Sequence, residues 1–252
     1  MSVARPAAAA TCFVERDPRV ALARRAAVEG IGTLLLMLMV AGAGDAVLRS
    51  GGLAGSGPLP GALATSGSLI GLILAFGAVS GGHFNPLITV LQWLAGGRRL
   101  DCTIAYVVAQ SAGAVAGAML ADALFGVRTQ AVAALPFGNP LLSEAVATAG
   151  LMIIVFGCSR SGRAQTGPFA VGAWLTAAIL ATPSGSYANP AVTLGALFTG
   201  GPVALSGGSA LLYVLAQSAG ALAAFLVISI AYPKRSLSLG GAAPTPVEGE
   251  AS

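Results

Sequence analysis

The apolar residues of this chain fall into long stretches separated by short segments rich in glycine, proline and polar residues. A helix of about 20 apolar residues spans the hydrocarbon core of a bilayer. The stretches that suit this role cover residues 26–48, 62–80, 103–124, 141–159, 167–182 and 207–231. The pattern therefore predicts an all-α integral membrane protein with six transmembrane helices.

Two further apolar stretches, residues 85–95 and 189–199, are too short to span. Each begins with Asn-Pro and follows a turn rich in glycine and serine. An asparagine caps a helix start, and the proline after it needs no N–H partner there. Backbone that does not span is tolerated at membrane depth where it lines a watery cavity. We therefore expect two re-entrant half-helices.

The two halves of the chain repeat one another. Three features recur in the same order: Glu29 as Glu144, Asn85-Pro86 as Asn189-Pro190, and residues 106–114 as residues 213–221. Three spans per repeat is an odd number, so the second half enters the membrane from the opposite side. The sequence predicts an inverted repeat, with halves at about 25–124 and 141–232.

The composition agrees with a lipid environment: 56% of the residues are hydrophobic and 9% are charged, against about 25% charged in soluble domains. The 35 glycines suit close helix packing, and Gly113 and Gly117 form a small-residue face. The cysteines are unpatterned and His83 is the only histidine. We expect no disulfide framework, metal, cofactor or nucleic-acid partner. No constellation of catalytic groups is visible, so an enzyme is disfavoured.

The basic residues predict the orientation. With both termini in the cytoplasm, only Arg49 and Arg128 of the 13 basic residues lie outside. The remaining 11 are cytoplasmic: Arg5, Arg16, Arg19, Arg24, Arg25, Arg98, Arg99, Arg160, Arg163, Lys234 and Arg235. This excess predicts a multi-pass protein of the cell inner membrane. We expect a cytoplasmic tail at 1–24, a channel domain at 25–232 and a disordered cytoplasmic tail at 233–252.

Two Asn-Pro half-helices in an inverted repeat would meet near the midplane with their N-termini facing. Asn85 and Asn189 can each point an N–H into the lumen, and carbonyls of residues 80–84 and 184–188 can accept hydrogen bonds. The positive helix ends repel cations and interrupt a proton relay. This arrangement predicts passive passage of small uncharged solutes.

The segments that carry these features, Ser80 to Pro86 and Ser184 to Ala191, resemble the two signature loops of the aquaporin (major intrinsic protein) family. Residues 29–33 resemble the family's opening helix, and the similarity covers about residues 24–232. The resemblance implies the aquaporin fold and a homotetramer with one pore per subunit. It also implies that Asn85-Pro86-Leu87 and Asn189-Pro190-Ala191 form the centre of the pore.

The sequence departs from the family pattern in two places. Leu87 stands where the first motif usually has alanine, and Val192 stands where most members carry the filter arginine. Counting along the family pattern places the filter on Thr65, Ala177, Ser186 and Val192. A filter without a long cation or bulky rings is wide and neutral. In this respect the chain is similar to bacterial aquaglyceroporins that conduct undissociated arsenite, which implies arsenite-type hydroxides, glycerol, urea and water as solutes.

Other residues near the loops have supporting roles in this interpretation. The resemblance suggests that Glu29 and Glu144, costly within spans, accept hydrogen bonds from backbone N–H groups of the re-entrant loops. His83 is expected to brace its loop. Leu87 is expected to pack between the half-helices, although a partial plug of the lumen is the alternative.

Three other functions stay open on the sequence alone. A water-selective channel is possible if Val192 is tolerated in a narrow filter. A secondary transporter also uses inverted repeats and broken helices, but predicts saturation and dependence on an ion gradient. A structural protein without a pore would conduct nothing, and Leu87 would permit it.

Overall fold

The computed structural model describes residues 20–49, 58–126, 139–163 and 165–232. These residues form only helices, with no strand among them. The elements are α1 (Leu22–Arg49), α2 (Leu59–Ser80), α3 (Pro86–Leu94), α4 (Leu100–Phe125), α5 (Pro140–Arg160), α6 (Gly167–Ala181), α7 (Pro190–Gly195), the 3-10 turn η1 (Ala196–Phe198) and α8 (Gly207–Ala231). The predicted tails at 1–24 and 233–252 lie almost entirely outside the described residues.

Five helices, α1, α2, α4, α5 and α8, are long and apolar enough to cross a membrane. The sixth predicted span forms α6, which has 15 residues and is shorter than the others. Pro168 stands in its first turn, and Pro183 follows its end. Thr182 precedes that proline and is extended, with φ −121° and ψ 142°, because a residue before proline is disfavoured in the helical region. The protein is thus a multi-pass helical membrane protein.

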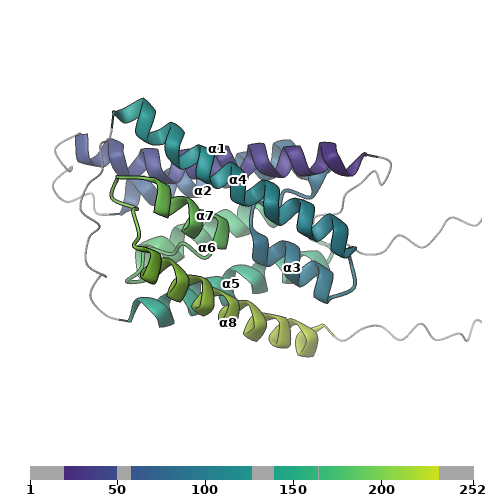
Figure 1. Ribbon diagram of the computed structural model, residues 1–252. Helices are drawn as coiled ribbons and strands as arrows, with labels where there is room; N and C mark the ends of the chain where they lie inside the picture. The colour runs from purple at the N-terminus through teal and green to yellow at the C-terminus, as the bar shows by residue number, and fades with distance from the viewer. Residues whose placement is uncertain (1–19, 50–57, 127–138, 164, 233–252) are drawn as a thin grey trace, which may run out of the picture.

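The packing of the helices follows the predicted repeat. Helix α1 packs along α4 and against α2, while α5 packs along α8 and against α6. The half-helices α3 and α7 pack on α4 and α8 and touch each other. Figure 1 shows both half-helices lying between the long helices, and shows α1 beginning and α8 ending at the same end of the bundle.

Glycines bring the paired helices into close contact. A Cβ on Gly113 or Gly117 of α4 would overlap the backbone carbonyls of Gly30 and Leu34 in α1. In the second repeat, a Cβ on Gly220 of α8 would overlap a carbonyl of α5. Such close approach of backbones is how membrane helices gain packing energy without a hydrophobic driving force.

Candidate functional site: a pore between two half-helices

The two half-helices begin with the expected capping geometry. Asn85 and Asn189 have extended backbones, and each side-chain oxygen accepts a hydrogen bond from the backbone N–H two residues later. The distances are 3.0 Å to Leu87 N and 2.9 Å to Ala191 N. Proline occupies the first helical position, where a backbone N–H would have no partner within the helix. Because proline has no N–H, no donor is left without a partner there.

The same asparagines tie the two loops together. Asn85 Nδ2 donates to the carbonyl of Ala188 at 2.9 Å, and Asn189 Nδ2 donates to the carbonyl of Phe84 at 2.8 Å. The N-termini of α3 and α7 therefore face each other across a reciprocal pair of hydrogen bonds. Each carboxamide has a second N–H, and both asparagines line the cavity described below.

The loops before the asparagines have an unusual backbone. Phe84 and Ala188 both have a φ of 46°, and Ser186 has a φ of 54°. Non-glycine residues rarely adopt this left-handed region, so the surrounding structure holds them there. The Phe84 ring is fully buried against Gly32 of α1, where a Cβ would overlap it. This conformation turns successive carbonyls of the loop in directions that a helix or strand would not allow.

Glu29 of α1 holds the first loop. Its Oε1 accepts from Ser80 Oγ at 2.6 Å and from the backbone N–H of His83 at 3.0 Å. Its Oε2 accepts from the backbone N–H of Phe84 at 2.7 Å and from Gln110 Nε2 at 2.8 Å. The backbone N–H groups of His83 and Phe84 are partners of the kind that the family resemblance implies. Four donors around one buried carboxylate compensate the cost of removing it from water.

Glu144 of α5 repeats this arrangement for the second loop. Its Oε1 accepts from Ser184 Oγ at 2.6 Å and from the backbone N–H of Tyr187 at 2.9 Å. Its Oε2 accepts from the backbone N–H of Ala188 at 2.9 Å and from Gln217 Nε2 at 2.7 Å. The inverted repeat therefore extends to individual hydrogen bonds, which explains why the same residue types recur at matched positions.

His83 braces the first loop and also borders the cavity. Its Nδ1 lies 2.9 Å from Thr89 Oγ1 of α3, and its ring packs edge-on against Tyr106 of α4 at 5.7 Å between centroids. The imidazole is 2% exposed, and Nε2 has no hydrogen-bond partner among the described residues. His83 is in the cavity wall, so its position combines the expected bracing with access to the lumen.

A cavity of about 370 Å³ reaches from one end of the bundle to the paired asparagines. At its mouth, which we define as Val47, Leu48, Pro58 and Gly61, it lies between the end of α1 and the start of α2. Further in, the wall is mostly aliphatic: Leu36, Val40, Leu69, Ile73, Ile88, Leu151, Val155, Val171, Leu175, Ile179 and Val192. No charged side chain of the described residues lines it.

Three of the four expected filter residues line this cavity, namely Thr65, Ser186 and Val192. Ala177 does not: it is exposed on another face of α6, while Leu175 and Ile179 form the wall there. The expected position of Ala177 is therefore corrected. Side chains two residues apart on a helix point in directions that differ by about 200° around the helix axis. An error of two positions in matching the sequence to the family pattern therefore moves a residue from the lumen to the outside.

Leu87, Ala191 and the two motif prolines are absent from the cavity wall. Leu87 is 9% exposed and belongs to the hydrophobic core together with Ile88 and Leu91. This placement favours the packing role expected for Leu87 over the alternative of a central plug.

The sequence analysis did not identify the aliphatic wall, including Leu36, Leu69 and Leu151. These residues lie on spans that are apolar on all sides, so hydrophobicity alone does not separate a face towards the lumen from a face towards lipid. Nothing in the local pattern marks them, and their role follows from the packing of helices that are distant in the sequence.

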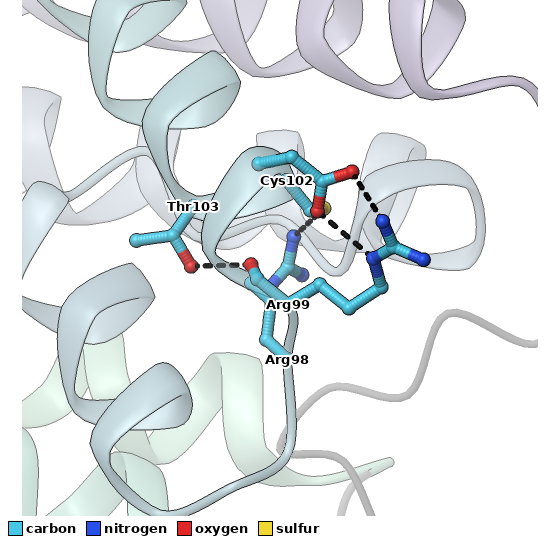
Figure 2. A network of polar contacts seen from close by, with 5 residues as sticks. Arg98, Arg99, Cys102 and Thr103 are labelled. Carbon is cyan, nitrogen blue, oxygen red and sulfur yellow. Dashed lines mark hydrogen bonds and ion pairs between the residues drawn. The ribbon is translucent and has the colours of Figure 1, made fainter.

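A polar cluster anchors the far end of α3, where the chain turns into α4. Arg98 donates to Gln92 Oε1 at 3.0 Å and to Cys102 Sγ at 2.7 Å, and its guanidinium lies 4.1 Å from the centroid of the Tyr106 ring. Figure 2 shows Arg98 and Cys102 beside the exposed pair of Arg99 with its neighbouring aspartate. Because Tyr106 OH donates to the carbonyl of Ser80 at 2.8 Å, the cluster connects the end of α3 to the loop at its start.

The fold and the site define a helical membrane channel with two half-helices that meet head to head. Comparison with known proteins agrees. The chain matches the family model described as "Major intrinsic protein" over residues 17–183 and 168–249. The chain belongs to this family, and it is a channel for water and small neutral solutes.

Individual relatives extend this comparison. The aquaglyceroporin AqpS of Rhizobium meliloti (strain 1021) is 36% identical over 213 residues, covering 82% of this chain and 89% of the relative. The probable aquaporin AqpM of Archaeoglobus fulgidus is 30% identical over 202 residues, covering 69% and 82%. The X-ray structure of the aquaglyceroporin from Plasmodium falciparum superposes with a TM-score of 0.69 at 18% identity, covering 82% of this chain and 95% of that one. At that identity the likeness supports the fold alone.

Proposed function

We propose that this channel has a wide, uncharged filter that passes neutral polyol-like solutes, such as glycerol, urea and trihydroxy-arsenic, together with water. The observation that carries the proposal is Val192 in the cavity wall, with no charged side chain among the described lining residues. The filter that we propose consists of Thr65, Ile179, Ser186 and Val192. Its two hydroxyl groups supply hydrogen bonds on an otherwise aliphatic surface.

The hydroxyl of Ser186 supports a role in contacting solute. The residue is 6% exposed and lines the cavity, and its Oγ has no hydrogen-bond partner among the described residues. A buried polar atom without a partner is costly, and a passing hydroxyl or amide group would satisfy it. The aliphatic residues opposite would contact the carbon face of the same solute.

The paired asparagines are the second part of the proposed pathway. The helix starts behind Asn85 and Asn189 concentrate positive potential at the point where the lumen passes between them. That potential would disfavour cations, while the free carboxamide N–H groups would donate to water or to solute hydroxyls. Glu29 and Glu144 hold the loops in this geometry and are not themselves in the cavity wall.

The proposal is tested with proteoliposomes carrying the full chain or Val192→Arg. Swelling in glycerol or urea gradients should fall about tenfold in the variant, because a barrier increase of about 1.4 kcal/mol is sufficient, while water flux stays measurable. Val192→Leu is the matched control, since it adds bulk without a cation or its hydrogen-bond donors. Equal solute flux through Val192→Arg and the unchanged protein would contradict the proposed filter.

The same assay distinguishes the alternative functions. A water-selective channel would show water flux without glycerol or urea flux in the unchanged protein. A secondary transporter would show saturation and would respond to an imposed ion gradient. Arsenite uptake into cells that lack their own facilitators tests whether metalloid hydroxides belong among the solutes.

We also propose that the protein is a homotetramer in the cell inner membrane with both termini in the cytoplasm. Helix α1 begins and α8 ends at the same end of the bundle (Figure 1), and the sequence count assigns 11 of the 13 basic residues to the segments expected in the cytoplasm. Large apolar side chains are exposed along the long helices, for example Val108, Leu124 and Leu226 at 62–66%, which suits contact with lipid or neighbouring subunits. Cross-linking in native membranes and protease access to tagged termini test these points.

A further inference from the structure

The two pore loops have one pair of matched aromatic side chains that line the cavity. His83 and Tyr187 occupy the same place, each three residues after the serine and two before the asparagine of its loop. The backbone N–H of each residue donates to Oε1 of the buried glutamate of its own repeat. Each ring packs edge-on against a tyrosine of a long helix, with centroids 5.7 Å and 5.6 Å apart. Backbone and ring are therefore placed alike in both repeats.

The polar atoms of the two rings differ in what they bind. His83 keeps its contact within its own repeat, because Nδ1 lies 2.9 Å from Thr89 Oγ1 of the half-helix that follows. Tyr187 instead reaches out of its half-helix, and its OH donates to the backbone carbonyl of Val203 at 2.7 Å. Val203 belongs to the irregular stretch 199–206 between η1 and α8. This hydrogen bond joins the second pore loop to a separate part of the wall and breaks the symmetry of the repeats.

Residues 202–203, which we call the wall segment, are the part of this stretch that lines the cavity. The stretch is anchored on both sides of the wall segment. Asp122 of α4 accepts from the backbone N–H of Gly200 at 2.9 Å, and the backbone N–H of Leu205 donates to the first carbonyl of η1 at 3.0 Å. Between these anchors, the hydrogen bond from Tyr187 is the only one that reaches the wall segment among the described residues. The position of the segment therefore depends on Tyr187 and on packing against α1.

The wall segment lies between the mouth and the paired asparagines. Pro202 packs beside Gly44 of α1, about one helical turn before Val47 and Leu48 of the mouth. Ser186, the residue before Tyr187, lines the cavity as well. A solute that enters at the mouth therefore passes the wall segment on its way to the pore loop.

We propose that Tyr187 sets the size limit of the channel by holding the wall segment against the second pore loop. The tyrosine is a rigid support, since its backbone is tied to Glu144 and its ring packs on Tyr213. Its short hydrogen bond to Val203 keeps the segment from moving away from the lumen. Water needs less width than a polyol, so the constraint acts first on larger solutes. Tyr187 is a positioning residue in this role, because it acts on solutes through Val203.

Tyr187→Phe tests the inference, because it removes the donor and keeps the ring. Swelling of proteoliposomes carrying the full chain is measured in water, urea, glycerol and erythritol gradients. The flux of glycerol relative to water should rise about threefold, which corresponds to a barrier lower by about 0.7 kcal/mol, and erythritol should gain more than glycerol. Tyr213→Phe is the matched control, since it removes a tyrosine hydroxyl from the same ring pair outside the cavity wall, and it should leave these ratios unchanged.

The ratio of fluxes is the readout, because losing a hydrogen bond lowers stability whether or not the bond affects selectivity. Equal ratios in Tyr187→Phe and the unchanged protein would overturn the inference, as would an equal rise in Tyr213→Phe. If Tyr187→Phe does not fold, Pro202→Gly takes its place, because it frees the backbone of the wall segment and should raise the same ratios.

The inference and the proposed filter fail separately. An unchanged protein that passes water alone would contradict the wide filter around Val192. Tyr187→Phe should then admit urea for the first time, and a variant that still passes water alone would overturn the role of Tyr187.

Discussion

Leu87 offers a direct test of whether the first motif controls packing or permeation. The residue stands where the second motif of this chain has Ala191, yet it is 9% exposed and lies outside the cavity wall. Leu87→Ala would make the first motif match the second and leave a void beside Ile88 and Leu91 in the core. If the Leu87 side chain serves to pack the core, Leu87→Ala should lower the free energy of unfolding and leave the flux of water and glycerol unchanged.

The size of the effect follows from the void. Removing three carbon atoms leaves about 80 Å³, and at about 24 cal/mol per Å³ of cavity this costs about 2 kcal/mol. The transfer contribution that raises such values in soluble proteins is small here, because detergent and lipid are as apolar as the core. We therefore expect the low end of the range seen for buried leucine, about 2 kcal/mol.

Titration with a denaturing detergent, followed by tryptophan fluorescence, measures this difference in free energy of unfolding. Trp93 lies on α3 itself and reports on its packing. Leu226→Ala is the matched control, because this leucine of α8 is 62% exposed and its removal should change stability by less than about 0.5 kcal/mol. Water and glycerol flux are recorded on the same preparations.

A different outcome would refute the packing argument. If Leu87→Ala leaves stability unchanged and increases solute flux, the leucine obstructs the lumen and the cavity wall assigned here is incomplete. A loss of both stability and flux would show that the contact of Leu87 also positions the helix start at Asn85.

Three further predictions concern the wall, the helix contacts and the loop supports. Ile179→Trp should lower glycerol flux in proteoliposomes about tenfold by narrowing the cavity, whereas Ala177→Trp should not; equal effects would restore Ala177 to the filter. Gly117→Ala should lower the free energy of unfolding in detergent by about 1–3 kcal/mol, because the added Cβ would overlap a carbonyl of α1. Gly71→Ala is the control, because a Cβ there meets open space and should not lower the free energy of unfolding. Glu144→Gln should lower stability by about 1.5–3 kcal/mol for each charge-assisted hydrogen bond that the amide cannot accept, and unchanged thermal stability would contradict the assigned support of the second loop.

The sequence by itself determined the features that depend on local chemistry or on chain length. Stretches of apolar residues long enough for a bilayer predicted six transmembrane helices, and the structure has five of that length and the shorter α6. The Asn-Pro pairs predicted the starts of α3 and α7, because capping and the proline ring act within one helical turn. The recurrence of Glu29 as Glu144 indicated a shared partner, and the backbone N–H groups of the loops are that partner.

Only the tertiary structure decided which side of each helix faces the lumen. In lipid both sides of a span are apolar, so periodicity does not separate Ile179 in the wall from Ala177 outside it. The left-handed backbone at Phe84 and Ala188 depends likewise on carboxylates from other helices. Gly30 and Gly113 are separated in the sequence by α2 and α3 and meet only because α1 packs along α4. Local patterns specify the elements, whereas the chemistry of the pore depends on contacts between elements that are distant in the chain.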